Sequence, residues 1–395
     1  MKKSFLALSL GSFSIGMTEF TMMGILPDIA KALNIDIPTA GHLISLYALG
    51  VVIGAPLLVI LTSKKPPKKV LIWLMAIFVF FNGVFAIAKG YHLILLCRFL
   101  AGLPHGAFFG VGAVIASRLA DKGKEAQAIA YMFTGMTIAN LAGVPLGTYI
   151  GHHYSWRITY GFIAFSGLIT MSAIFAWLPV IPVYYSGNIF KQFDFFKTKT
   201  AWLIIAIIGI GTGGLFAWIS YIAPLVIHVS HVSSDKVALI MVLVGFGMVV
   251  GNLIGGKLAD AITPPKAVVV SFCSMMLCLL IVFFTAQIQW LTYIMAFITG
   301  AASFSNSSPV QMMLINAAEG SETIAAAAGQ ASFNFANSIG SYFGGLPIVY
   351  GYAYNAPSLV GAGLAGFGIF FAVCYIMIQK NNVRPAKEYC AINEC

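Results

Sequence analysis

The amino-acid sequence predicts an all-α membrane protein with twelve transmembrane helices in two pseudo-symmetric six-helix bundles. The first observation is composition, because 59% of the 395 residues are hydrophobic and 9% are charged, against about 25% charged residues in an ordinary soluble chain. The second is length, since twelve apolar runs of about 20 residues could each cross a bilayer. The third is an internal repeat. No polar stretch approaches the roughly 50 residues that a separate domain needs, which excludes an attached soluble enzyme.

Apolar runs along the chain give the expected helices in order. The first run follows Lys2 and Lys3 and extends through Pro27. No small-residue cleavage site follows it, so we expect a span and not a signal peptide. The longest connection, 180–201, is a linker between a bundle at 1–179 and a bundle at 202–395 with a short tail. The expected spans are 5–27, 41–62, 70–88, 93–117, 126–149, 158–179, 202–227, 237–256, 267–286, 290–314, 324–349 and 359–378.

The basic residues sort by the side of the membrane on which these spans place them. Seventeen of the 22 Lys and Arg residues fall at the N-terminus, in even-numbered loops or at the C-terminus. Lys31, Lys89, Arg157 and Lys236 fall on the other side, and Arg98 lies inside a span. The positive-inside rule therefore places both termini and the linker in the cytoplasm. Topology explains the net charge of +10, and no nucleic-acid partner is expected.

Equivalent small residues recur in the two halves of the chain. At an offset of 197, Gly50 matches Gly247 and Gly54 matches Gly251. Parallel repeats of this kind are typical of a transporter architecture whose binding site lies between the halves near mid-bilayer. Farther along, an offset of 201 pairs Gly135, Ala139 and Gly143 with Ala336, Gly340 and Gly344.

Small residues at every fourth position predict close helix packing in the fifth span. Pro145 interrupts that span, removes a backbone hydrogen bond and is expected to kink the helix. The face therefore either serves tight packing alone or also marks where the halves separate during a conformational cycle. The small residues are Gly135, Ala139, Gly143, Gly147 and Gly151.

Of the 34 charged residues, only Glu19 and Arg98 fall well inside an expected span. A central charge costs about 2.5–3.5 kcal/mol on insertion scales, so each should face a polar cavity or pair with the other. Glu19 lies about 12 Å below Pro27, while Arg98 and His105 lie about 8 and 18 Å below the end of their own span. Such a carboxyl group can bind and release protons as its surroundings change. The alternatives are a static Glu19–Arg98 ion pair and a His105 that only donates to a carbonyl.

Further polar residues lie at membrane depth in spans 7, 10 and 11. The run from Ser303 to Gln311 predicts a broken or cavity-lining helix. Asn337 and Ser341 continue a polar stripe of the eleventh span. These side chains either line a cavity or form interhelical hydrogen bonds, worth about 0.6 kcal/mol each on average. The candidate cavity residues are Phe20, Trp218, Tyr221, Asn306, Gln330 and Asn334.

The residues singled out above resemble the major facilitator superfamily, specifically proton-coupled drug and sugar efflux transporters of the arabinose efflux permease type. A loop motif of that family is matched after span 8 by Gly256, Asp260 and Lys266, whereas Val59 and Ser63 replace its glycine and aspartate after span 2. The resemblance extends to the span 4 arginine motif (Arg98, Gly102, Gly106), the span 5 antiporter motif (Gly143, Pro145, Gly147) and the span 1 acidic region (Glu19, Phe20).

The resemblance implies an exporter of a small organic solute, a sugar or an amphipathic drug, that exchanges it for protons by alternating access. Spans 1, 4, 7 and 10 would surround the cavity, Glu19 would bind the proton, and Arg98 and His105 would modulate it. We expect a monomer in a bacterial inner membrane, driven by the proton gradient without cofactor or metal. The alternatives are a proton-linked symporter that imports sugars or nucleosides, and a polytopic enzyme, for which no nucleophile or metal cluster is evident.

Overall fold

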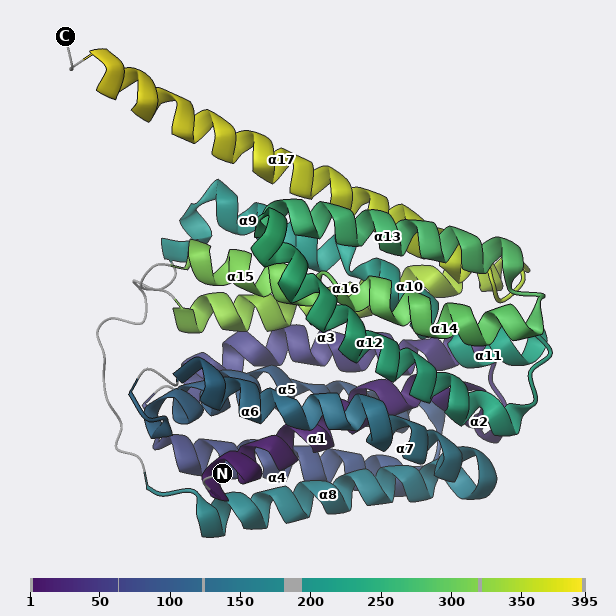
Figure 1. Ribbon diagram of the computed structural model, residues 1–395. Coiled ribbons are helices and arrows are strands. Elements are labelled where there is room, and N and C mark those ends of the chain that lie inside the picture. Colours follow the sequence, from purple (N-terminus) through teal and green to yellow (C-terminus); the bar gives the residue numbers. More distant parts are fainter. Residues whose placement is uncertain (1–2, 63, 123–124, 181–193, 319–321, 393–395) are drawn as a thin grey trace.

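The computed structural model describes residues 3–62, 64–122, 125–180, 194–318 and 322–392, and it is almost entirely helical (Figure 1). The N-terminal half contains α1 (Lys3–Gly24), α2 (Leu26–Leu33), α3 (Ile37–Thr62), α4 (Pro67–Ile87), α5 (Tyr91–Leu119), α6 (Glu125–Ile138), η1 (Ala139–Gly143), α7 (Val144–Ile150), η2 (Gly151–Ser155) and α8 (Trp156–Trp177). The C-terminal half contains α9 (Lys199–Ala206), η4 (Ile207–Gly211), α10 (Gly213–Ile219), α11 (Ile222–His228), η5 (Ser234–Lys236), α12 (Val237–Ile262), α13 (Pro264–Thr285), α14 (Gln289–Phe304), α15 (Ser307–Ala317), α16 (Glu322–Val349) and α17 (Pro357–Ile392).

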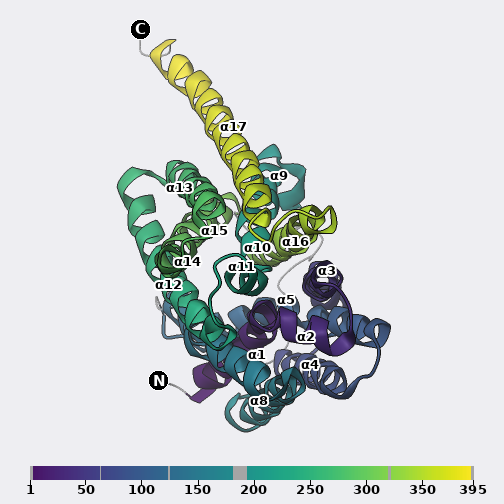
Figure 2. The same cartoon turned by 90° about the vertical axis from the view of Figure 1, so that its right-hand side faces the viewer.

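These helices form twelve spans in two bundles, as the sequence predicts. Within the described residues, nine stretches are long and apolar enough to cross a membrane, one of which, Gln127–Trp177, holds both the fifth and the sixth span. Seen along the helices, the N-terminal bundle lies beside the C-terminal bundle (Figure 2). We call the end where α1 begins and α8 finishes the terminal end, and the opposite end the distal end.

Several helix boundaries differ from the expected ones. The first span ends at Gly24, and α2 is a separate helix because Pro27, which cannot donate a backbone hydrogen bond, lies in its first turn. The fifth span continues past 149 through η2 to Ser155, and α17 extends past 378 to Ile392. Positions 181–193 of the predicted linker lie outside the described residues.

Two spans depart from a regular α-helix near the residues that the sequence marks, and the predicted break in the tenth span is confirmed. The backbone becomes π-helical over η1, immediately before Pro145, whose missing N–H leaves one backbone carbonyl without its usual partner. In the tenth span, α14 stops at Phe304 and α15 starts at Ser307, so the polar run does interrupt the helix.

The internal repeat is visible in how the glycines pack. A Cβ atom on Gly50 would collide with the Phe99 carbonyl oxygen, and one on Gly247 would collide with the Phe297 carbonyl oxygen. The repeat therefore places the same glycine at the crossing of α3 with α5 and at the crossing of α12 with α14. Close backbone approach is how apolar helices associate when lipid supplies no hydrophobic drive.

Contacts between the halves lie on two sides of the molecule. On one side α3 packs along α16 (Figure 2). On the other side α12 packs against η1 and α7, the distal half of the fifth span, whereas α6 packs against α1 and α5 of its own bundle. Because α11 also contacts α1 and α2, and η5 contacts η2, the two halves meet closely at the distal end.

We predict that Gly102→Ala lowers the thermal unfolding temperature of the purified protein, whereas Gly83→Ala does not. A Cβ atom at Gly102 would overlap the Tyr47 carbonyl oxygen, while at Gly83 the nearest atom, Ala164 Cβ, is 4.0 Å away. Overpacking of this kind costs about 1–3 kcal/mol. Fluorescence-monitored melting in detergent measures both variants, and equal melting temperatures would contradict the packing at the α3–α5 crossing.

Candidate functional site

Glu19 lies at the contact between the two halves. It belongs to α1, most of whose residues are buried, and its own side chain is 1% exposed. The Asn337 Nδ2 atom of α16 donates to Glu19 Oε1 at 3.3 Å. The other oxygen, Oε2, lies 4.0 Å from His105 Nε2 and has no hydrogen-bond partner among the described residues. The carboxyl group therefore touches both halves and keeps one oxygen available.

Arg98 lies in the same region but is bound inside the N-terminal half. Its Nε atom donates to the Leu43 carbonyl at 3.1 Å, and Nη1 donates to the carbonyl and hydroxyl oxygens of Thr18 at 3.2 and 3.1 Å. Tyr47, Phe85 and Tyr160 surround the guanidinium with their rings, the nearest being Tyr47 at 4.2 Å. No ion pair within 4.0 Å joins it to Glu19 in the described structure, so the static-pair alternative is wrong for this conformation.

Asn82 of α4 completes the attachment of Arg98. The Thr18 hydroxyl donates to Asn82 Oδ1 at 2.7 Å, which leaves the Thr18 oxygen free to accept from Arg98. Asn82 in turn donates to the Phe78 carbonyl at 2.8 Å and is fully buried. Four helices of one bundle therefore hold the guanidinium, which acts as a fixed positive charge near Glu19.

His105 is held by Tyr47, not by a backbone carbonyl. Its Nδ1 atom lies 3.0 Å from the Tyr47 hydroxyl, and both residues are 1% exposed. With Nε2 facing Glu19, the imidazole joins α3 to α1. The alternative of a carbonyl-bonded His105 is therefore wrong.

Beyond Asn337, the polar stripe of α16 continues across the boundary between the halves. The Ser341 hydroxyl lies 2.8 Å from the Ser45 hydroxyl of α3, and the Tyr221 hydroxyl donates to the Ser341 carbonyl at 2.8 Å. Tyr221 occupies a slot between Gly41 of α3 and Gly345 of α16, where a Cβ atom on either glycine would overlap its hydroxyl. The structure therefore places Tyr221 at the distal contact of the halves.

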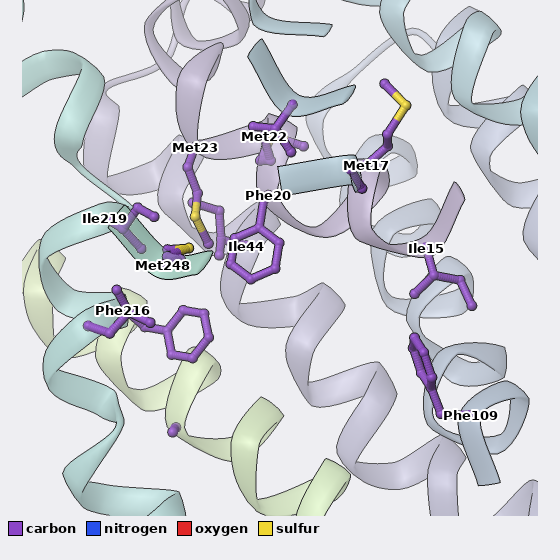
Figure 3. Packing of buried hydrophobic residues seen from close by; sticks show 14 of the residues in the cluster. Ile15, Met17, Phe20, Met22, Met23, Ile44, Phe109, Phe216, Ile219 and Met248 are labelled. Carbon is purple, nitrogen blue, oxygen red and sulfur yellow. The ribbon is translucent and has the colours of Figure 1, made fainter. Parts of the chain in front are cut away.

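Phe20 belongs to an aromatic cluster at the interface. Its ring stacks on Phe216 of α10 at a centroid distance of 6.3 Å, and Phe216 meets Phe333 of α16 edge to face at 5.1 Å. Figure 3 shows Phe20 and Phe216 turned toward one another. Phe304, at the end of α14, contacts Phe333 at 6.5 Å, so the cluster contains side chains from spans 1, 7, 10 and 11.

The other candidate cavity residues lie within the C-terminal half. Trp218 lines a small hollow with Leu225, Val282 and Met295, which places its ring between spans 7, 9 and 10 and not at the interface. Asn306 is buried at the break between α14 and α15, and its Nδ2 has no hydrogen-bond partner in the described residues. Asn334 is fully buried and donates to the Gln330 carbonyl at 3.1 Å.

The residues matched to conformational motifs fall into two groups. Gly143 and Gly147 lie against α1, where added Cβ atoms would meet Met17 and Thr21 at 2.8 Å, and Pro145 lies between them in α7. Gly256 has room for a side chain, since Ser308 lies 3.8 Å away. Asp260 and Lys266 are exposed on either side of the turn at Thr263, which has a positive φ of 89°.

A partly buried acid–base pair lies at the distal end of the N-terminal half. Asp28 Oδ1 of α2 lies 3.0 Å from His152 Nδ1 of η2. Burial raises the pKa of Asp28, and the neighbouring His152 opposes that shift. His152 and His153, expected in a loop, lie in η2, and His153 Nδ1 lies 3.0 Å from the Tyr149 carbonyl. Among the described residues, no three His, Cys, Asp or Glu side chains lie together in a way that could hold a metal ion.

The structure thus brings together Glu19 and His105 with two partners, Tyr47 and Asn337, that are not among the candidate site residues. The sequence marks Asn337 only as part of the polar stripe of the eleventh span. Tyr47 lies in an otherwise apolar run and gave no comparable signal. Phe216 and Phe333 also look like ordinary core residues in the sequence.

Comparison with known proteins places this architecture in a family. The chain is 41% identical over 365 residues to the putative transporter AraJ of Escherichia coli, covering 92% of this chain and 93% of that protein. It is 35% identical to the inner membrane transport protein YdhP of Escherichia coli, over 97% of this chain and 98% of that one. It is 28% identical to a probable sugar efflux transporter of Helicobacter pylori, over 92% of each.

A solved structure has the same fold. It is the crystal structure of a bacterial homologue of the human lysosomal transporter Spinster in an inward-facing, unoccupied conformation, which matches with a TM-score of 0.71 at 15% identity over 96% of this chain and 97% of that chain. The Major Facilitator Superfamily model matches residues 8–345. The chain therefore belongs to the Major Facilitator Superfamily and is a multi-pass membrane transporter.

Proposed function

We propose that this transporter exports a small organic solute in exchange for protons by alternating access, and that Glu19 is the proton-binding group. The observation that carries the proposal is the position of the Glu19 carboxyl, with one oxygen on Asn337 of the C-terminal half and the other facing His105 of the N-terminal half. A buried carboxyl group that touches both halves ties its proton occupancy to their relative position.

The coupling follows from the energetics of a buried charge. An ionised carboxylate in this apolar region needs donors, and those near it are Asn337 on one side and His105 on the other. Separating the halves removes Asn337 and admits water, which changes the free energy of the ionised form. By linkage, protonation of Glu19 then shifts the balance between arrangements of the halves by the same amount.

Arg98 contributes a charge that does not travel with the C-terminal half. Its hydrogen bonds all go to helices of the N-terminal half. The electrostatic attraction between this guanidinium and an ionised Glu19 persists through the cycle, while the contact with Asn337 is made and broken. Arg98 therefore makes a constant contribution to the proton affinity of Glu19, and the contact with Asn337 makes the contribution that changes during the cycle.

The solute class is a sugar or an amphipathic drug. Phe20, Phe216 and Phe333 supply aromatic faces beside the amide of Asn337, a combination suited to stacking with a few directed hydrogen bonds. Export is favoured over import by the match to the span 5 antiporter motif and by the relative named as a probable sugar efflux transporter. The transporter would work as a monomer and draw on the proton gradient, without a cofactor.

The orientation follows from charge. The positive-inside rule assigns the terminal end to the cytoplasm of a bacterial inner membrane, so that both termini are cytoplasmic. The distal contact of the halves, with Tyr221 in its glycine slot, is then the periplasmic closure.

In everted membrane vesicles with an acidic interior, the wild-type protein should accumulate at least one compound from a panel of radiolabelled sugars and cationic dyes. Glu19→Gln should lose gradient-driven accumulation by at least about 100-fold, because the amide cannot bind and release a proton, while counterflow without a gradient remains measurable. Asp36→Asn, which removes an acid at the distal end, is the matched control. Gradient-driven accumulation by Glu19→Gln would refute the assignment of Glu19, and accumulation only in right-side-out vesicles would favour the importing symporter.

Asn337→Ala should reduce gradient-driven exchange about tenfold or more, because Glu19 Oε1 loses its donor from the C-terminal half and hydrogen bonds to charged groups contribute about 1.5–3 kcal/mol. Ser338→Ala, one residue along α16, is the control and should behave as wild type. Initial rates in the same vesicles measure both, normalised to the amount of folded protein. Equal rates for the two variants would show that the contact between halves at Glu19 is not used.

A further inference from the structure

Tyr47 touches both of the groups that flank Glu19. Its ring lies 4.2 Å from the Arg98 guanidinium carbon, and its hydroxyl lies 3.0 Å from His105 Nδ1. The ring is packed with Val51 and Ala101 and is 1% exposed. Among the described residues, Tyr47 alone makes a hydrogen bond or ring contact with both Arg98 and His105, so it links the fixed cation to the imidazole.

The chemistry of a phenol hydroxyl suits this position. A neutral imidazole carries its proton on one ring nitrogen, and a hydroxyl group can donate to the bare nitrogen or accept from the protonated one. With the proton on Nε2, His105 presents a donor to an ionised Glu19, and the Tyr47 hydroxyl donates to Nδ1. With the proton on Nδ1, the bare Nε2 can accept from a protonated Glu19, and the Tyr47 oxygen accepts from Nδ1.

We propose that Tyr47 is a positioning residue that holds the His105 imidazole with Nε2 toward Glu19 in both protonation states of the carboxyl group. The inference rests on the proposed function of Glu19 as the proton-binding group. In this proposal the Tyr47 hydroxyl keeps His105 Nε2 facing the Glu19 carboxyl group both before and after the proton is released. Phenylalanine could supply the ring beneath Arg98 but not this partner.

The surroundings of Glu19 limit which other groups could produce the same effect. The titratable or charged side chains around it are Tyr47 of α3 and Arg98 and His105 of α5, and Tyr160 of α8 lies farther off, over Arg98. From the C-terminal half, Asn337 donates to Glu19, and Phe216 stacks on Phe20, the residue next to Glu19. Neither Asn337 nor Phe216 has a titratable side chain. Tyr160 also lies over Arg98, at 5.7 Å, but among the described residues it makes no hydrogen bond or ring contact with His105 or Glu19, and so it provides a matched control.

The test is an infrared titration of the purified full-length protein in detergent, with protons as the only ligand. The carboxyl C=O band of Glu19 is identified by its disappearance in Glu19→Gln, and its amplitude is followed against pH. Tyr47→Phe should move the midpoint by about one pH unit, because His105 Nδ1 loses the hydroxyl that is its one hydrogen-bond partner among the described residues. The free energy of a lost buried hydrogen bond is large enough to shift a pKa by that amount. Tyr160→Phe, which removes a hydroxyl from the neighbouring ring, should leave the midpoint unchanged.

A second comparison tests whether the effect of Tyr47 passes through the imidazole of His105. His105→Leu should also move the midpoint, and adding Tyr47→Phe to it should cause no further change. If Tyr47→Phe does not fold, His105→Leu tests the proposal alone. An unchanged midpoint in His105→Leu would show that the imidazole does not affect proton binding by Glu19, and the proposal would be overturned.

The outcomes separate the two proposals. A Glu19 band that titrates normally but has the same midpoint in wild type and Tyr47→Phe overturns the role of Tyr47 and leaves the proton-binding role of Glu19 intact. Equal shifts in Tyr47→Phe and Tyr160→Phe also overturn it, because the effect would then arise from the aromatic surroundings of Arg98. A wild-type band that never titrates overturns both proposals.

Discussion

The structure depends on keeping a carboxyl group in a region where water does not supply its hydrogen bonds. Inside an apolar bundle an ionised acid needs donors, and each donor must be held by a helix that has few polar groups of its own. Glu19 meets this requirement at a boundary, because one of its oxygens is bonded by α16 and the other faces α5. Because these partners lie on different halves, the stability of the ionised form of Glu19 depends on the distance between the halves.

The N-terminal half is built to hold the charged groups still. Thr18 and Leu43 bind the guanidinium of Arg98, and Asn82 holds Thr18 in place. The glycines at the α3–α5 crossing bring those two backbones close together, next to the bond between Arg98 and the Leu43 carbonyl. The same crossing in the C-terminal half, between α12 and α14, has the glycines but no buried charged side chain among the described residues. The same packing scheme therefore supports a charged site in one half and a largely apolar one in the other.

Much of the fold could be predicted from the sequence, because apolar length, charge distribution and the glycine repeat act at the level of whole helices. Glu19 and Arg98 stood out because charges inside spans are rare. The directions of Trp218 and Tyr221 could not be predicted, since their rotation about the helix depends on the turn between α10 and α11, which no motif marks. Tyr47 was missed for a related reason: a tyrosine in an apolar run looks the same whether its hydroxyl has a partner or not.

The slot around Tyr221 has a consequence for how this protein can change over time. The phenol occupies the space that side chains at Gly41 and Gly345 would need, one on each half. Enlarging either glycine is costly while the ring is present, and shrinking the ring leaves a void that the glycines alone do not fill. The three positions therefore constrain one another, and substitutions accepted at one should depend on compensating substitutions at the other two.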